Sequence, residues 1–246
     1  MARGIYLSCG DSAHTGLPDR SIDLIVTDPP FFDNVHYSEL ADFFFAWQQL
    51  RTAPHASAAV STRDPCEVQD SDAKRFAAKL MGVFGECRRV LKDDGMLVFT
   101  YHHSREEGWT ALAQAVLGAG FAVVNSQPVK AEMSVATPKS QAKDPIQLDI
   151  IIVCRKQDSP ALPAPVAPAK AIASAKSKLA RLRGEGFMLS RNDRRIVLLG
   201  QLLATLRRPG DDANLAPRVE AELDADDIAG PTPSKRLAQP LLFESD

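Results

Sequence analysis

An apolar run of six residues, IDLIVT at 22–27, ends abruptly in an acid and two prolines, DPP at 28–30. A continuous apolar run of this length, bounded by turn-forming residues, predicts a parallel strand that is buried on both faces. Proline has no backbone N–H to donate to a neighbouring strand, so this strand must stop before Pro29. We therefore expect a buried strand whose carboxyl end presents Asp28.

Strand-like runs and helical stripes alternate along the first two thirds of the chain. The other strand-like runs are residues 4–9, 96–101, 121–126 and 148–155. Apolar residues recur at helical spacing over residues 40–47, 76–91 and 109–117. The first stripe places Phe43, Phe44 and Trp47 on one side of a helix, and we expect these three side chains in the core. The alternation predicts an α/β fold with an open, mostly parallel sheet and helices on both faces.

Composition divides the chain into four segments. They are the strand–helix alternation of residues 1–156, a Pro/Ala-rich stretch at 157–175, a basic stretch at 176–208 and an acidic tail at 209–246. The second segment predicts a semi-rigid extended linker, and the tail predicts disorder. In the basic segment, Ser190 and Asp193 have the spacing of a capping box, which predicts a helix that begins at Arg191.

Several classes of protein are disfavoured by composition. The four cysteines, Cys9, Cys66, Cys87 and Cys154, form no C-x-x-C pair, which argues against zinc spacing and against a disulfide framework. No signal peptide is visible and no apolar run approaches the length of a membrane-spanning helix, so a reducing cytoplasm is the expected location. The formal charge of −2 argues against a chain coated in basic residues, but it allows a local basic groove.

The DPP segment has the properties of an acceptor array. In open α/β sheets, ligands bind outside the carboxyl ends of the strands, which is where Asp28 is expected. Two prolines hold the backbone rigid, so the Asp28 carboxylate and the Pro29 carbonyl can accept hydrogen bonds from one amino group. Such bonds would draw the nitrogen lone pair out of conjugation. Phe31 offers a flat surface on which a flipped-out base could stack.

Asp28-Pro29-Pro30-Phe31, directly after an apolar strand, resembles the (D/N/S)-P-P-(Y/F/W) motif of amino-methyltransferases, which methylate adenine N6 or cytosine N4. The longer run TDPPFFDNVHYSELADFFFAW is similar to TDPPYYDNVPYAELSDFFYVW of the large adenine-specific DNA methylases, with phenylalanine in place of both tyrosines after the prolines. The resemblance covers residues 5–156. It implies a Rossmann-like fold and methyl transfer from S-adenosylmethionine to a base in nucleic acid, adenine N6 in DNA.

The resemblance also assigns roles to residues. It implies direct in-line transfer without a covalent intermediate or a metal, with Asp28, Pro29, Pro30 and Phe31 as the catalytic motif. Aspartate at the first motif position favours adenine over cytosine in this family. The residues that the resemblance and the strand pattern indicate for the substrate are Phe31, Phe32, Asn34, Tyr37 and His102. His102 and His103 are adjacent, so their side chains should point to opposite faces, and only one can line the pocket.

The cofactor side of the resemblance is incomplete. The segment GDSAHTG is similar to one that borders the adenine of S-adenosylmethionine, which implies that Asp11 and Ser12 contact the cofactor. These enzymes also carry a glycine-rich F-x-G-x-G loop after their first strand. The G-x-G pairs in this chain, at 118–120 and 184–186, do not follow an apolar strand. The resemblance therefore implies a sheet that lacks its first strands, followed by a small helical carboxyl-terminal extension.

Two alternatives stay open at this point. The same motif serves in enzymes that methylate amino groups of RNA bases. Alternatively, the chain is a non-catalytic or incomplete subunit of a split methyltransferase, and a partner chain supplies the glycine-rich cofactor loop.

Overall fold

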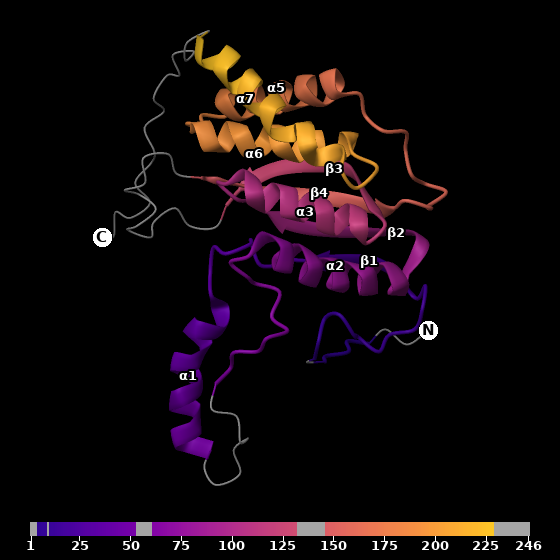
Figure 1. Ribbon diagram of the computed structural model, residues 1–246, viewed down its shortest axis with the longest axis vertical. Coiled ribbons are helices and arrows are strands. Elements are labelled where there is room, and N and C mark those ends of the chain that lie inside the picture. The colour runs from indigo at the N-terminus through magenta and orange to yellow at the C-terminus, as the bar shows by residue number, and fades with distance from the viewer. Residues whose placement is uncertain (1–3, 9, 53–60, 132–145, 229–246) are drawn as a thin grey trace, which may run out of the picture.

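The computed structural model describes residues 4–8, 10–52, 61–131 and 146–228. Its strands are β1 (Ile22–Thr27), β2 (Leu91–Tyr101), β3 (Phe121–Lys130) and β4 (Leu148–Lys156). They form one sheet in the order β1-β2-β4-β3 (Figure 1). The mixed α/β architecture is confirmed. The prediction of a mostly parallel sheet was wrong for the described strands, because β4 inserts antiparallel between β2 and β3 and only β1 and β2 are parallel.

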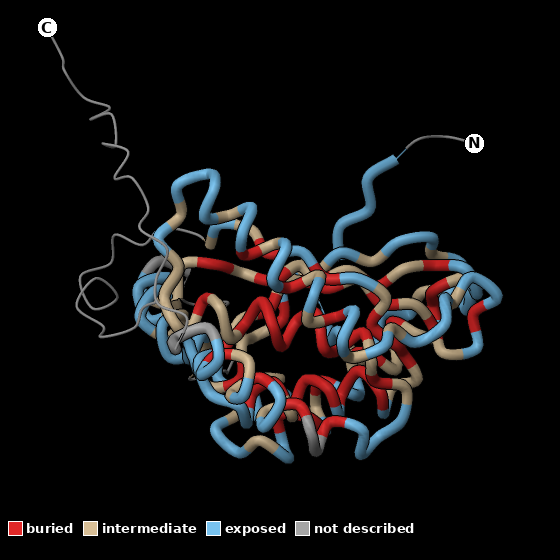
Figure 2. The backbone as a smooth tube through the Cα atoms, turned by 90° about the horizontal axis from the view of Figure 1, so that it is seen from above, coloured by how far each residue is buried: buried red, intermediate tan, exposed pale blue. Residues whose placement is uncertain are grey.

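Six α-helices are described. They are α1 (Tyr37–Thr52), α2 (Ala73–Val90), α3 (Glu106–Gly118), α5 (Pro168–Gly184), α6 (Arg191–Leu202) and α7 (Leu215–Ile228), with short 3-10 turns at Leu203–Thr205 and Asp211–Asn214. Helix α2 packs against α3, whereas α5 and α7 pack against α6 (Figure 1). In Figure 2 the buried backbone stretches gather where these helices meet the sheet.

Three helices pack on the same face of the sheet. Phe84 of α2 lies 5.2 Å from Phe99 of β2, ring centroid to ring centroid. Tyr101 is on the same face of β2 as Phe99, and it contacts Trp109 of α3. Tyr101 also pairs with Ile150 of β4, which lies against Gly200 of α6. The buried face of the sheet is therefore the one that carries α2, α3 and α6.

The opposite face of the sheet is uncovered among the described residues. Along β4, buried residues alternate with half-buried ones, and Val98 and Val153 on this second face are only half-buried. Leu24 and Val26 of β1 are 49% and 71% exposed. The predictions of helices on both faces and of a fully buried first strand were therefore wrong for this part of the chain. An apolar strand requires burial somewhere, but its sequence does not say which element provides it.

Helix α1 projects away from the sheet (Figure 1). Phe43, Phe44 and Trp47, which were expected in the core, are each more than 60% exposed, so that prediction was wrong. No other described element packs over this side of α1. The helix is held instead by Asp42, whose carboxylate accepts hydrogen bonds from the backbone and side chain of Thr62. These bonds lower the pKa of Asp42 to about 2.

The carboxyl-terminal helices share the core of the sheet. Helix α5 begins at Pro168, inside the stretch expected to be an extended linker, and its buried Leu179 joins the same hydrophobic cluster as Ile196 of α6. Helix α7 falls in the tail expected to be disordered, and Val219 and Leu223 anchor it, whereas residues 229–246 lie outside the described residues. Alanine-rich and acidic segments thus form helices here because each presents a few apolar residues to α6.

The capping box that was predicted for α6 is confirmed. The Ser190 hydroxyl accepts a hydrogen bond from the Asp193 backbone N–H at 2.9 Å, and the Asp193 carboxylate accepts one from the Ser190 N–H at 3.0 Å. Asp193 also accepts a hydrogen bond from the Gln147 N–H at 2.8 Å, directly before β4. The start of α6 is thereby fixed at the end of the sheet where β1 and β2 finish.

Candidate active site

Asp28 stands at the carboxyl end of β1, as predicted. Because β1 and β2 are parallel, their carboxyl ends lie side by side, with Thr27 paired to Phe99. Thr100, the next residue of β2, donates a hydrogen bond from its hydroxyl to the Asp28 carboxylate. Asp28 remains exposed, so its second oxygen can accept a hydrogen bond from a ligand.

Pro29 and Pro30 set the backbone that follows Asp28. Pro29 is buried and Pro30 is half-buried, so this turn is packed as well as covalently restricted. No hydrogen bond from the described residues reaches the Pro29 carbonyl. The Asp28 carboxylate and the Pro29 carbonyl are consecutive acceptors with capacity for a ligand amino group.

Phe31 lies next to these acceptors and is held from one side. Its ring centroid is 4.7 Å from that of His102, at an interplanar angle of 59°. A second contact, 5.5 Å and close to perpendicular, joins Phe31 to Tyr101. The ring is half-buried, so it is positioned while part of it stays accessible. Asp28, Phe31 and His102, three of the predicted site residues, thus come together in what we call the Asp28 cluster, with Thr100.

His102 is held by a carboxylate from another strand. The Nδ1 atom of His102 makes a hydrogen bond with the Asp149 carboxylate, near the start of β4. The two side chains are 13% and 16% exposed. Sequence reasoning missed Asp149 and Thr100. The sequence does show an acid, Asp149, at the second position of an otherwise apolar strand, LDIIIV. Only the strand order shows that its partner is His102.

Phe32 is not part of the Asp28 cluster. It is 1% exposed, and its ring lies 5.4 Å from the rings of Phe76 and His103, inside the core. The Arg105 guanidinium covers the ring at 5.2 Å and also binds Asp33. Burial raises the pKa of Asp33, but the hydrogen bonds and charges of Arg105 and His103 together outweigh burial and leave that pKa lowered. Phe32 and Asp33 thus fasten the loop that carries the acceptors.

Asn34 and Tyr37 lie on the exposed side of the same loop. The Asn34 N–H donates a hydrogen bond to the Phe31 carbonyl at 3.2 Å, and Tyr37, 57% exposed, begins α1. Among the described residues, neither the Asn34 nor the Tyr37 side chain contacts the Asp28 cluster. Their predicted role toward the substrate stays a prediction.

Asp11 and Ser12 lie in an exposed turn. The Asp11 carboxylate accepts hydrogen bonds from the Ala13 N–H and from His14 Nδ1, both at 2.8 Å, and the bond from His14 lowers its pKa. The carboxylate is therefore already used within its own turn. No glycine lies between β1 and α1 or between β2 and α3. Neither of these two loops therefore offers the glycine-rich segment that the resemblance implies for the cofactor.

The loop that carries Asp11 is anchored on α2. Thr15 donates hydrogen bonds from its N–H and its hydroxyl to Glu86, at 2.9 and 2.6 Å, and Arg89 binds the same carboxylate at 2.7 Å. The bonds from Arg89 and Thr15 lower the pKa of Glu86 to about 2.

Replacing Glu86 with glutamine is expected to lower the free energy of unfolding by about 1 kcal/mol at pH 7, a value moderated by solvent screening of Arg89. The lowered pKa means that this contribution is complete above the unfolded-state value of about 4.3 and is lost as pH falls toward about 2. Urea unfolding of wild type and E86Q between pH 7 and pH 2 measures it. The difference should vanish at the acid end. E185Q serves as the control, because Glu185 is exposed and forms no ion pair with any residue that the structure describes. Equal losses in both variants would contradict the anchoring role.

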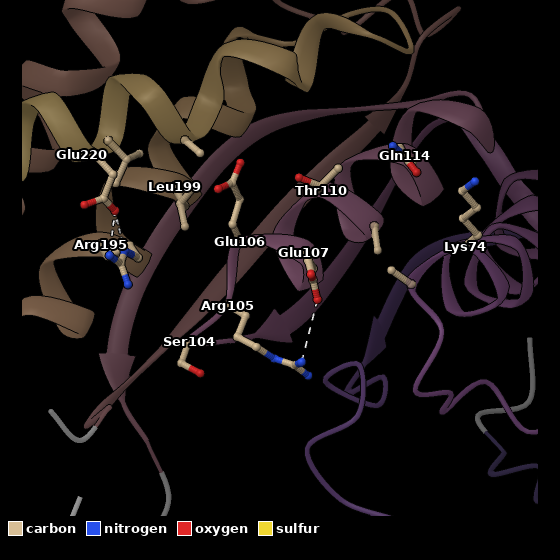
Figure 3. A pocket seen from close by; sticks show the side chains of 14 residues that line it. Lys74, Ser104, Arg105, Glu106, Glu107, Thr110, Gln114, Arg195, Leu199 and Glu220 are labelled. Atoms are coloured by element: carbon tan, nitrogen blue, oxygen red, sulfur yellow. Dashed lines mark hydrogen bonds and ion pairs between the residues drawn. The ribbon is translucent and has the colours of Figure 1, made fainter. Parts of the chain in front are cut away.

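A cavity of about 640 Å³ lies apart from the Asp28 cluster, between α3, α6 and α7 (Figure 3). Its walls carry both signs of charge, including the Arg195–Glu220 ion pair at 2.6 Å. Arg105 borders the cavity and also binds Asp33, so this lining residue connects the cavity wall to the loop of the site. The Asp28 cluster itself lies at an open end of the sheet.

Comparison with known proteins yields one family. The model of a family described as DNA methylase, of the N6 and N4 methyltransferases, matches residues 22–195, well over half of the 246 residues. The matched range contains the whole Asp28 cluster and Asp149. No curated protein sequence matches the chain. The match supports methylation of a nucleic-acid base as the activity of the family to which this chain belongs. Among the described helices, none has the length and apolar character needed to cross a membrane.

Proposed function

We propose that this chain, which belongs to the DNA methylase family, transfers a methyl group to the exocyclic amino group of a base in nucleic acid, adenine N6 in DNA. The observation that carries the proposal is the Asp28 cluster. A carboxylate and a carbonyl that accepts no hydrogen bond from the described residues follow one another at the end of β1, and Phe31, whose ring packs on His102, follows in the same loop. A flipped adenine has the two features that match, an amino group with two hydrogens and a flat ring.

In the proposed reaction, the amino hydrogens donate to the Asp28 carboxylate and the Pro29 carbonyl, while Phe31 stacks on the base. The nitrogen lone pair would then be free to bond the methyl carbon of a bound donor, whose sulfur would keep the electron pair of the C–S bond. S-adenosylmethionine, which this family generally uses, supplies the methyl group when bound. Rate enhancement comes from positioning and from acceptors aimed at the charge that develops on nitrogen.

The test is incorporation of labelled methyl groups into DNA and RNA substrates, followed by separation of the nucleosides. The expected product is N6-methyladenine in DNA. Label in RNA alone would replace the DNA proposal by RNA base methylation, and label in N4-methylcytosine would overturn the assignment of adenine. No transfer to either polymer, with or without a completing partner, would overturn the proposed function.

Replacing Phe31 with alanine is expected to weaken binding of the flipped base by about 1 to 3 kcal/mol, roughly 5- to 150-fold. Phe31 provides the stacking surface, and its removal also frees the His102 ring that packs on it at 4.7 Å. Fluorescence of 2-aminopurine at the target position reports flipping directly. F31Y is the matched control, because it keeps the aromatic face. If F31A flips the base as well as F31Y does, Phe31 is not the stacking residue.

A second candidate, a composite enzyme, is favoured by the uncovered parts of the sheet. Strand β1 is an edge strand, although its Leu24 and Val26 are apolar and largely exposed. Exposed apolar edge strands are generally avoided because they pair with other chains. In this version the sheet is Rossmann-like and lacks its first strands, and a partner chain that carries a glycine-rich loop adds a strand along β1. Helices α5 to α7 would then be an extension of that sheet.

Equilibrium binding of S-adenosylmethionine by the isolated chain separates the two versions. If wild type binds S-adenosylmethionine tightly and the Asp11→Ala variant does not, the composite enzyme is ruled out and a cofactor role for the Asp11 turn is supported. Absence of binding would mean that the chain needs a completing partner. In that case Val26→Arg, on the exposed face of β1, is expected to abolish activation by the partner, whereas Val98→Thr, at the paired position of β2, should not.

A further inference from the structure

His102 and Asp149 form a dyad with a defined arrangement of hydrogens. An ionised carboxylate only accepts hydrogen bonds, so the bond between Nδ1 and Asp149 places the imidazole hydrogen on Nδ1. The Nε2 atom of the neutral ring is then an acceptor. No hydrogen bond from the described residues reaches Nε2, and the ring keeps 13% of its surface exposed. The dyad therefore presents a proton acceptor at the edge of the site.

The dyad lies close to the acceptors that hold the amino group. Thr100, which binds Asp28, and His102 are two residues apart, so they lie on the same face of the sheet at a spacing of about 7 Å. The Phe31 ring lies 4.7 Å from the His102 ring, so the residue proposed to stack on the base also contacts the dyad. This spacing leaves room for one water to bridge an amino nitrogen held at Asp28 and Nε2 of His102.

The neighbouring histidine shows what a structural role looks like in this protein. His103 is 1% exposed, its Nδ1 accepts a hydrogen bond from the Arg105 N–H at 3.0 Å, and its Nε2 lies 3.5 Å from Asp33. Burial lowers the pKa of His103. Both of its nitrogens thus have partners within the protein. His102 differs in that one nitrogen has a carboxylate partner and the other faces no described partner.

We propose that His102 is the catalytic proton acceptor of the methyl transfer and that Asp149 is its positioning residue. The inference rests on the proposed function. When the N–C bond has formed, the amino nitrogen holds the methyl group, two hydrogens and a positive charge. One N–H bond breaks, its electron pair stays on nitrogen, and the proton moves to Nε2 of His102. The neutral methylamino group and an imidazolium result, and Asp149 stabilises the imidazolium until its proton passes to solvent.

The first test exchanges the hydrogen-bonding partner while keeping its shape. In Asp149→Asn, the amide can donate to Nδ1, which moves the ring hydrogen to Nε2 and removes the acceptor. The single-turnover rate of methyl transfer is expected to fall roughly a hundredfold, with the affinity for DNA unchanged. Asp158→Asn makes the same charge change at a distant ion pair with Arg88, and it should keep the wild-type rate. If wild type is active and D149N is equally fast, the inference alone is overturned. If wild type stays inactive with and without a completing partner, the proposed function is overturned.

The second test does not depend on one variant folding well. Nitrogen-15 chemical shifts of His102 distinguish the two tautomers, and the inference requires hydrogen on Nδ1 in wild type and its loss from Nδ1 in D149N. Wild type with hydrogen on Nε2 would overturn the acceptor role. Added imidazole is expected to restore part of the lost rate in His102→Ala. If H102A is folded but imidazole does not raise its rate, at any concentration that leaves wild type unaffected, the inference is also contradicted.

Discussion

Replacing Asp28 with alanine is expected to slow single-turnover methyl transfer by roughly 10² to 10³-fold while leaving the affinity for DNA nearly unchanged. The carboxylate meets the amino group where positive charge develops, so its contribution is larger in the transition state than in the bound ground state. Thr100 donates to the carboxylate and thereby orients it. The measurement is rapid-quench transfer with DNA in excess, together with a binding curve for the same duplex.

Two further variants sharpen this prediction. Asp28→Asn keeps an acceptor oxygen but removes the charge, so its rate should fall between those of wild type and D28A. Asp23→Ala removes an aspartate near the other end of β1, where it pairs with Lys92 at 2.5 Å, and it should transfer at the wild-type rate. Equal rates in D28A and D23A would show that Asp28 does not act on the reacting nitrogen. Because Asp28 is exposed, its loss should leave the thermal midpoint nearly unchanged.

Local sequence was sufficient to predict the acceptor part of the site. An apolar strand that stops at Asp28, followed by two prolines, is a contiguous signal, and the parallel pairing of β1 with β2 places it as expected. The Ser190 capping box is contiguous as well. The Asp149 contact depends instead on β4 lying between β2 and β3, a long-range pairing that periodicity does not encode.

The predictions that were wrong concerned which apolar side chains are buried and by which element. Helical spacing correctly places Phe43 and Trp47 on one side of α1, but a stripe indicates only that burial is favourable, and among the described residues nothing buries it. The same limit explains the uncovered face of β1. Phe31 and Phe32 show that even two adjacent residues of the same type can differ in burial. The two residues have the same side chain, yet the left-handed backbone of Phe32, φ 56°, turns its ring into the core while Phe31 faces the cluster.

Replacing Phe32 with alanine is expected to lower the free energy of unfolding by about 3 to 5 kcal/mol. The ring is 1% exposed and fills the space between Phe76 and His103, so its removal leaves a cavity and also strips Arg105 of the surface it covers. A positive φ is costly for a residue with a side chain, and the loop keeps it only because burial of the ring offsets the strain. Urea unfolding measures the loss.

Phe43→Ala is the matched control for this prediction, since Phe43 is 63% exposed and the same truncation there should change stability by no more than about 0.5 kcal/mol. Methyl transfer gives the second readout. Phe32 and Asp33 hold the loop against α2 and Arg105, so in F32A the Asp28 carboxylate and the Pro29 carbonyl lose their common support. Phe32→Leu, which keeps apolar volume, should recover stability and rate together. Recovery of stability without recovery of rate would mean that the ring touches the substrate, as the sequence resemblance implies, rather than anchoring the loop.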